Sequence, residues 1–255
     1  MARLPAVSPP PARHGLARVL SKLGICSRTE AAGWIAAGRV TVEGRVVRDA
    51  EFPVVRGRQR IAIDGVEVTA GERVHLMLNK PRGLVTSARD ERDRDTVYRC
   101  FDGAGLPWIA PVGRLDKASE GLLLFSNDPE WAARITDPET GPHKTYHVQV
   151  DRIPDPSSLA RLLAGVVDDG ESLRAHSVEL LRQGEKNAWL EIVLDEGRNR
   201  QIRRLLAASD LGVLRLIRVS IGRLVLGELP KGQWRRLSPE EVAALSPPEP
   251  AQERR

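Results

Sequence analysis

The sequence predicts an α+β protein with two domains, and three observations favour this fold class. The chain has 255 residues, which fits one or two domains of about 150 residues each. Apolar residues at helical spacing near the amino terminus are followed by short alternating segments. From residue 76 onward, several strand-like runs are separated by only a few helical patterns, which favours a mixed, mainly antiparallel sheet. We expect domains at 14–72 and 76–242, with flexible tails at 1–13 and 243–255.

The first domain begins with two helices. Apolar residues recur at helical spacing over Leu16–Leu23, and Gly24 ends this pattern. Ser27 and Glu30 have the spacing of a reciprocal capping box, which predicts the start of a second helix that ends at Gly38.

Short strands follow these helices. The alternating residues Val40–Val42 and Val46 flank the turn Glu43-Gly44, and Asp64-Gly65 joins two further strands at 61–63 and 66–68. The elements Gly24-Ile25-Cys26-Ser27-Arg28 and Gly38-Arg39-Val40-Thr41-Val42-Glu43-Gly44 resemble the S4 RNA-binding domain, although Glu43 stands where that family often has Asn or Asp. The resemblance implies that basic residues of this domain contact RNA phosphates, and the candidates are Arg18, Lys22, Arg28 and Arg39.

The second domain begins near Leu76 with the strand Leu76–Leu78, which runs into a turn at Asn79–Gly83. Further strands are expected at 121–126, 145–150, 189–194 and 214–219. Helices are expected at 129–136, 156–164 and 200–208.

The positive charge is unevenly distributed. The formal net charge is +5, and residues 1–75 carry all of it, with 12 Lys or Arg against 7 Asp or Glu. A second basic concentration lies at Arg198–Arg223, where Asp210 is the only acid. Two basic regions favour a polyanionic partner such as a nucleic acid, and a solvated basic surface is the alternative.

Several classes of protein are disfavoured. No apolar run approaches the roughly 20 residues of a membrane span, and Met1–Arg13 lacks the apolar middle of a signal peptide, so we expect a cytosolic protein without a membrane partner. Cys26 and Cys100 are too few for a disulfide framework or a cysteine zinc site. His143 and His147 would lie about 13 Å apart on one strand, too far to share a metal. We expect neither a metal nor a cofactor.

Asp116 is the most informative acidic residue. It lies between Gly113 and Gly121, directly before an apolar strand, where a carboxylate is poorly solvated. Such a residue must be paired or functional, and the alternative is an aspartate that only caps the turn before the strand.

Several motifs in the same order resemble the RsuA/RluB family of ribosomal RNA pseudouridine synthases. They are Asn79-Lys80-Pro81-Arg82-Gly83, Gly113-Arg114-Leu115-Asp116-Lys117-Ala118-Ser119-Glu120-Gly121, Lys144-Thr145-Tyr146, Glu196-Gly197-Arg198-Asn199-Arg200-Gln201-Ile202-Arg203-Arg204 and Leu216-Ile217-Arg218-Val219. The resemblance runs from about Leu16 to about Val242. It implies an enzyme that isomerises a uridine in ribosomal RNA without a cofactor.

The resemblance also implies roles for single residues. Asp116 would be the nucleophile that adds to the sugar or to the base ring of the target nucleoside. Arg203 would stabilise the charged carboxylate through a bidentate bond, and Arg204 is the alternative for that role. Tyr146 would pack its ring against the flipped base, or else it is a core aromatic residue.

Other basic residues near these motifs are candidates for RNA contact. Arg114 would orient the flipped nucleotide or its phosphate, with an ordinary salt bridge as the alternative. The remaining candidates for contact with the RNA backbone are Lys80, Arg82, Arg198, Arg200 and Arg204.

The expected partner is ribosomal RNA or a ribosome assembly intermediate, bound by a monomer. The segments Lys144–Asp151 and Arg198–Arg204 resemble large-subunit members more than small-subunit ones. An inactive RNA-binding or assembly factor is the alternative from another class. A glycoside hydrolase would need a second carboxylate, for which Glu120 is the only nearby candidate.

Overall fold

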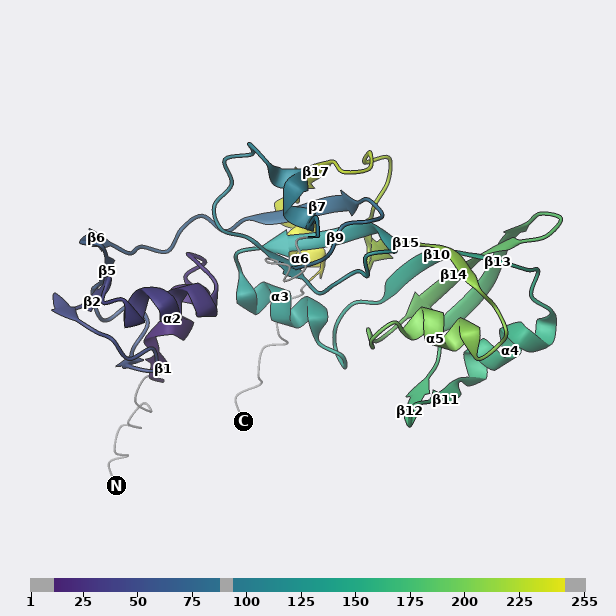
Figure 1. The fold of residues 1–255 in the computed structure, drawn as a ribbon, viewed down its shortest axis with the longest axis horizontal. Helices are drawn as coiled ribbons and strands as arrows, with labels where there is room; N and C mark the ends of the chain where they lie inside the picture. Colours follow the sequence, from purple (N-terminus) through teal and green to yellow (C-terminus); the bar gives the residue numbers. More distant parts are fainter. Residues whose placement is uncertain (1–11, 88–93, 246–255) are drawn as a thin grey trace, which may run out of the picture. The chain divides into compact units, whose positions relative to one another are not determined.

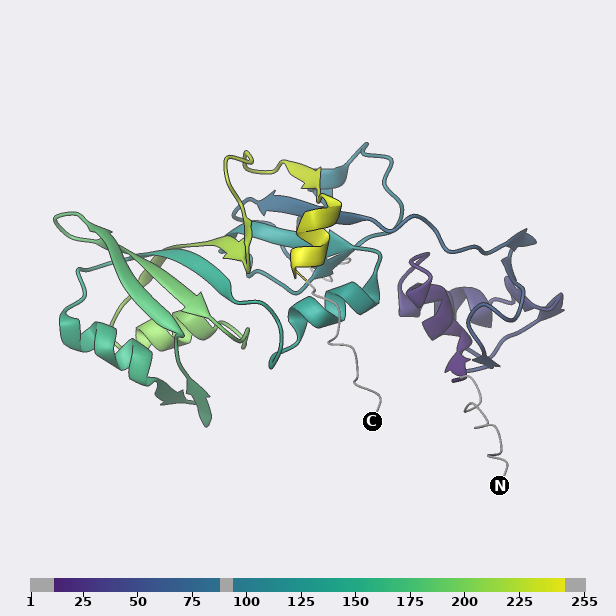
Figure 2. The same ribbon diagram turned by 180° about the vertical axis from the view of Figure 1, so that it is seen from behind.

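The computed structural model describes residues 12–87 and 94–245, which form two compact units (Figure 1, and from behind in Figure 2). The first unit contains the residues up to Arg73 with the short segments Pro107–Ile109 and Asn127–Pro129, and the second contains the remainder. The parts of the predicted tails at 1–11 and 246–255 lie outside the described residues. No helix in the described ranges is long and apolar enough to cross a membrane.

Two helices and short strands form the first unit. Its elements are β1 (His14–Gly15), α1 (Leu16–Lys22), α2 (Arg28–Ala36), β2 (Val40–Val42), β3 (Arg45–Val46), β4 (Pro53–Val54), β5 (Ile61–Ile63) and β6 (Val66–Glu67). The predicted capping box is confirmed, because the Ser27 hydroxyl accepts from the Glu30 amide at 3.1 Å and the Glu30 carboxylate accepts from the Ser27 amide at 3.0 Å. Leu16, Leu20 and Ile35 are fully buried between the helices and the strands.

Two tight turns shape the sheet of this unit, whose strand order is β3-β2-β5-β6. Glu43-Gly44 and Asp64-Gly65 have positive φ at both positions, which is the geometry of a two-residue hairpin turn that matches the strand twist. Glu43 therefore occupies the turn in the same left-handed conformation that Asn or Asp would adopt.

The second unit is built on a nine-stranded sheet, which confirms the predicted α+β fold class. The path through the sheet is β13-β14-β10-β15-β9-β7-β17, with β16 beside β15 and β8 beside β9. The strands are β7 (His75–Lys80), β8 (Ala110–Val112), β9 (Glu120–Ser126), β10 (Lys144–Val150), β13 (Ser177–Gln183), β14 (Ala188–Leu194), β15 (Val213–Ile221), β16 (Leu224–Val225) and β17 (Trp234–Arg236). Only the β15–β9 pair is parallel among these neighbours.

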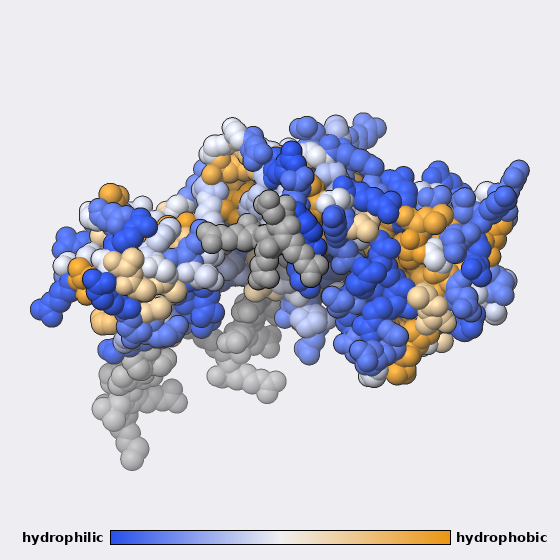
Figure 3. All heavy atoms as spheres, viewed as in Figure 1, coloured by the Kyte–Doolittle hydropathy of each residue, from blue (hydrophilic) through white to orange (hydrophobic). Residues whose placement is uncertain are grey.

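The helices of this unit pack beside the two halves of the sheet (Figures 1 and 2). They are η1 (Val97–Phe101), α3 (Pro129–Thr136), α4 (Pro156–Ala164), α5 (Gln201–Ala207) and α6 (Pro239–Leu245), and a separate hairpin is formed by β11 (Val166–Asp168) and β12 (Glu171–Leu173). Trp131 of α3 and Leu245 of α6 belong to the core that contains Leu122 and Leu124 of β9. Figure 3 shows apolar residues gathered toward the end of the sheet that carries β13, where Leu180 and Leu181 are exposed.

Two predicted boundaries are wrong. Residues 243–245 belong to α6 rather than to a flexible tail, because Leu245 is buried in the core. Strand β7 continues through Asn79 and Lys80, which were predicted to form a turn. These two residues pair with Leu122 and Gly121 of β9, so the strand ends only at Pro81, which has no amide hydrogen to donate.

Gly121 allows β9 and β15 to approach closely at the point where they run parallel. It pairs with Arg218, its φ is +99°, and a Cβ atom at this position would lie 2.3 Å from the Arg218 carbonyl oxygen. A side chain is therefore excluded on both steric and conformational grounds. This contact places the loop before β9 beside the middle of β15.

Candidate active site

Asp116 lies on a loop whose backbone is fixed from several sides. The Ser119 amide donates to the Asp116 carbonyl at 2.9 Å, which closes the turn into β9. The Thr86 hydroxyl donates to the Leu115 carbonyl at 2.8 Å, and the Gly83 amide donates to the Lys117 carbonyl at 2.8 Å. The backbone on both sides of the Asp116 side chain is thus held by hydrogen bonds.

Lys80 is buried and holds this loop through hydrogen bonds, so the predicted contact of Lys80 with RNA is wrong. Its side chain is 0% exposed, and Nζ donates to the carbonyl oxygens of Ser119 at 2.8 Å, Pro81 at 3.1 Å and Asp116 at 3.2 Å. Burial lowers the pKa of Lys80 to about 8, against the opposing charges of Asp116 and Glu120. Because all three N–H donors of Lys80 are used by backbone carbonyls, Lys80 positions the loop and has no donor left for RNA.

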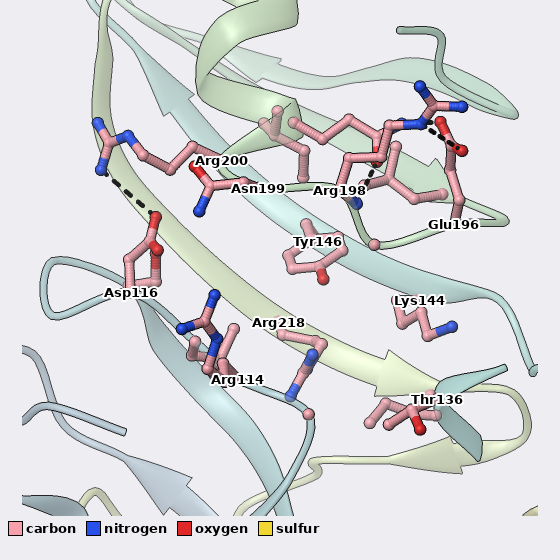
Figure 4. Close-up of a pocket in the computed structure, with 18 of the residues that line it drawn as sticks. Arg114, Asp116, Thr136, Lys144, Tyr146, Glu196, Arg198, Asn199, Arg200 and Arg218 are labelled. Carbon is pink, nitrogen blue, oxygen red and sulfur yellow. Dashed lines mark hydrogen bonds and ion pairs between the residues drawn. The ribbon is translucent and has the colours of Figure 1, made fainter. Parts of the chain in front are cut away.

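Two arginines of the α5 region face the Asp116 carboxylate. Arg200 Nη1 lies 3.5 Å from Asp116 Oδ2, and Arg203 Nε lies 3.9 Å from the same oxygen. Arg200 adopts a left-handed conformation with φ of 49° at the start of α5, which turns its side chain toward Asp116 (Figure 4). The sequence indicated Arg203 but missed Arg200, whose predicted partner was phosphate.

Arg203 differs from the prediction in its geometry. A single long contact joins it to Asp116, in place of the expected bidentate bond. Its Nε is buried without a hydrogen-bond partner, and Nη2 donates to the Ala118 carbonyl at 3.5 Å. Burial and the neighbouring Arg200 charge lower the pKa of Arg203, but a guanidinium stays protonated in proteins.

Arg204 is absent from the lining of this pocket, so the alternative that it faces Asp116 in place of Arg203 is wrong. Its guanidinium pairs with Asp168 of β11 and Glu171 of β12, and Nη2 donates to the Asp168 carbonyl at 2.7 Å. Neighbouring residues of a helix point in different directions, so only one of the two consecutive arginines faces Asp116.

The Asp116 loop forms one wall of a pocket of about 560 Å³, which is within the range of small-molecule sites. The floor is formed by Lys144 and Tyr146 of β10 and by Arg218 of β15, all at most 9% exposed (Figure 4). Tyr146 and Arg218 are register partners on adjacent strands. Burial and the Arg218 charge lower the pKa of Lys144. Lys144 and Arg218 were not among the predicted site residues, although strand alternation places Lys144 on the same face as Tyr146.

Exposed arginines line the same pocket. Arg114 extends beside Asp116 and makes no ion pair with any residue in the described part of the chain, so the salt-bridge alternative is not observed. Arg198 lines the pocket with its Nε bonded to Glu196 at 2.8 Å. Arg82 is exposed outside the pocket, and its charge acts on Arg203.

Glu120 is not available as a second catalytic carboxylate. It is 3% exposed, accepts two hydrogen bonds of 3.1 Å from Arg215 and one of 2.6 Å from Lys231, and is absent from the pocket lining. Burial raises its pKa, but the hydrogen bonds from Arg215 and Lys231 outweigh burial and hold the pKa below its usual value. Glu120, the candidate that the sequence offered for the second acid of a hydrolase, is therefore engaged outside the pocket.

The predicted RNA-binding residues of the first unit lie on its two helices and at the start of its sheet. Arg18 on α1 and Arg28 on α2 are exposed, and Lys22 is half-buried at the end of α1. Arg39 is exposed but pairs with Asp64 at 2.5 Å and lies 5.4 Å from the centre of the Trp34 ring.

Comparisons with known proteins match a different family to each of the two units. Residues 74–208 match the family described as RNA pseudouridylate synthase, and residues 15–59 match the S4 domain family. A solved structure described as a crystal structure of pseudouridylate synthase superposes with a TM-score of 0.62 and 30% identity, covering 91% of this chain and 99% of that one.

Similar curated proteins are also named pseudouridine synthases. A Bacillus subtilis protein named ribosomal large subunit pseudouridine synthase B is 35% identical, with 90% of this chain and 94% of the relative covered. A Haemophilus influenzae protein of the same name is 38% identical, over 90% of this chain and 66% of the relative. An Aquifex aeolicus protein named uncharacterized RNA pseudouridine synthase is 35% identical over 89% of this chain and 92% of its own length.

Proposed function

Because the chain belongs to the RNA pseudouridylate synthase family, we propose that it isomerises a uridine of large-subunit ribosomal RNA to pseudouridine, with Asp116 as the nucleophile. The observation that carries this proposal is the fixed position of Asp116 at the wall of a basic pocket, next to Arg200 and Arg203. The choice of ribosomal RNA is supported by the names of the Bacillus and Haemophilus relatives.

The reaction explains why a pocket of this kind is needed. The bond between the sugar and the base nitrogen must break, the base must rotate, and a new bond must form to a base carbon while the base stays bound. A stacked or paired uridine exposes neither bond, so the nucleotide must leave its stack, which costs a few kcal/mol. Contacts of basic residues with phosphates offset this cost.

Asp116 supplies a carboxylate oxygen for attack, either on the sugar carbon or on the base ring. Arg200 and Arg203 place positive charge 3.5 and 3.9 Å from one oxygen of this carboxylate, where they can orient it toward the substrate. The ring of Tyr146 offers a flat surface for the extruded base, and its hydroxyl has no hydrogen-bond partner in the described part of the chain. This hydroxyl can therefore assist proton transfer at the base carbon.

The first unit would dock the substrate. Its exposed cations Arg18 and Arg28 suit phosphate contacts, which supply affinity and orientation rather than sequence choice. We expect the protein to act in the cytosol as a monomer on ribosomal RNA or on an assembly intermediate.

Tritium release from uridine carbon five tests the enzymatic proposal. Large-subunit and small-subunit ribosomal transcripts labelled at that carbon are incubated with the protein, and we expect about one tritium released per large-subunit transcript. Asp116→Asn should abolish release while the dissociation constant for RNA stays within about threefold, because the amide keeps the size but loses the nucleophile.

Asp210→Asn is the matched control. Asp210 is exposed, lies outside the pocket and has a φ of 57°, a conformation that asparagine tolerates. This variant should release tritium at the wild-type rate. Substantial turnover by Asp116→Asn would remove the nucleophile assignment, and RNA binding without any tritium release by the wild-type protein would favour the inactive binding factor.

A further inference from the structure

The pocket floor carries three polar groups on one face of two adjacent strands. Lys144 and Tyr146 lie two residues apart on β10, and Arg218 on β15 is the register partner of Tyr146. Because alternate residues of a strand share a face, all three project from the same side of the sheet. Figure 4 shows Tyr146 between Arg200 and Arg218, with Lys144 farther along β10 from Asp116.

The Arg218 guanidinium is only partly used by the protein. Its Nε donates to the Leu122 carbonyl at 2.7 Å, which fixes the orientation of the plane. Nη2 is buried without a hydrogen-bond partner, and no residue in 12–87 or 94–245 accepts a hydrogen bond from Nη1. The Lys144 ammonium likewise donates to no acceptor in these residues, and Asp137 and Asp195 act on it only through their charge.

A buried guanidinium with an unsatisfied donor, on the same floor as a second cation, is unfavourable for folding alone. Leaving a buried donor unsatisfied costs about 1–3 kcal/mol, and more for a charged group. Neither group carries an ion pair that would explain its burial. The arrangement is explained if a ligand with acceptor oxygens enters the pocket and satisfies these donors.

The shape of an extruded nucleotide decides which of its oxygens reach the floor. Its two phosphates remain joined to the RNA chain, so they must stay at the open side of the pocket. The exposed residues Arg114, Arg198 and Arg200 line that side and suit the phosphates. Only the base can reach the buried floor, where it meets Arg218 and Lys144.

We propose that Arg218, assisted by Lys144, is a further catalytic residue that donates hydrogen bonds to the carbonyl oxygens of the extruded uracil and stabilises the negative charge that builds on them. The proposal rests on the proposed function. Arg218 is anchored through Nε before the substrate arrives, so its remaining donors are preorganised, as effective charge stabilisation requires.

The electron count supports this role for both points of attack. If Asp116 bonds to the sugar carbon, the breaking sugar–nitrogen bond leaves its electron pair on the base, where it spreads onto the carbonyl oxygens. If Asp116 bonds to the base ring instead, the electrons of the carbon–carbon double bond move toward the carbonyl oxygen at carbon four. Either way the charge collects on oxygens that Arg218 can contact, and Arg218 gives up no proton.

Single-turnover tritium release at saturating RNA tests the proposal. We expect Arg218→Gln to lower the rate by about 100-fold or more, the usual effect of removing one such donor, while RNA affinity stays within about threefold. Arg218→Lys, which keeps the charge, should recover part of the rate. Arg223→Gln is the matched control, because Arg223 is exposed just beyond the end of β15 and outside the pocket. A rate for Arg218→Gln within threefold of the control would overturn the proposal.

A second measurement needs no turnover. Barbiturate is a pyrimidine ring with a negative charge shared by its carbonyl oxygens at pH 7, and its binding is measured by calorimetry. We expect Arg218→Gln to weaken binding at least tenfold relative to Arg223→Gln, and equal affinities would overturn the proposal. If Arg218→Gln does not fold, Lys144→Gln takes its place, because Lys144 makes no hydrogen bond through its ammonium in the described residues. Wild-type protein that binds barbiturate but releases no tritium would refute the proposed function and leave the subsite standing.

Discussion

At the scale of single residues, the site depends on charges that are buried to hold other groups in place. Lys80 is fully buried and makes three hydrogen bonds to backbone carbonyls, one of them the carbonyl of Asp116 itself. Glu120, four residues after Asp116, is held by Arg215 and Lys231. The Asp116 loop is thus held at both ends by ionic groups that do not line the pocket.

The burial of Lys80 predicts a specific dependence of stability on pH. Its pKa in the folded protein is about 8, below the usual 10.5, so between these values the unfolded chain binds a proton that the folded chain does not. Stability therefore rises with pH across this window through Lys80, and the contribution is flat below pH 8. Denaturant unfolding between pH 7 and 10 should show wild type gaining stability relative to Lys80→Met. If the unfolding free energies of the two proteins change in parallel with pH, the lowered pKa of Lys80 is contradicted.

At the scale of elements, local pattern identified most strands and helices, including both ends of α3 and α4, but it did not identify the ends that depend on pairing between distant strands. The capping box at Ser27 was predictable because both groups lie within four residues. The continuation of β7 through Lys80 was not, because it depends on pairing with β9, some forty residues away. Likewise, the choice between Arg203 and Arg204 needed the family resemblance. The contact of Arg200 with Asp116 depends on a left-handed backbone conformation at Arg200, which no sequence pattern predicted.

Gly121 is the element-scale feature that most directly supports the site. Gly121→Ala combines a forbidden φ with a Cβ atom 2.3 Å from the Arg218 carbonyl oxygen. We expect a loss of unfolding free energy above about 3 kcal/mol, because a backbone clash adds to the cost of roughly 1–2 kcal/mol for a left-handed side chain. Denaturant unfolding measures the loss.

Gly232→Ala separates the two contributions. Gly232 has a φ of +78° with open space around the Cβ position, so only the conformational cost applies. It should lose about 1–2 kcal/mol and keep the wild-type rate of tritium release. Equal losses for the two glycine variants would show that β9 and β15 can separate without cost.

At the scale of the whole molecule, net charge is unevenly distributed along the chain. The first 75 residues carry the entire excess of five positive charges, whereas the rest of the chain is neutral and places five of its arginines around one pocket. Phosphate contacts at exposed cations release counterions, so their contribution to affinity falls steeply with salt, while buried floor residues contribute little to that dependence. Salt dependence therefore reports on docking, and single-turnover rate reports on chemistry.

The double variant Arg18→Gln, Arg28→Gln tests this division. Each lost contact with duplex phosphate should lower the slope of log affinity against log salt by about 0.9, so the pair should lower it by about 1.8. The single-turnover rate at saturating RNA should stay within about twofold, because neither residue lines the pocket. Lys186→Gln, which removes an exposed charge on the β13–β14 hairpin, should leave both quantities unchanged. An unaltered slope in the double variant would mean that α1 and α2 do not contact RNA phosphates, and docking would then have to come from the arginines at the pocket alone.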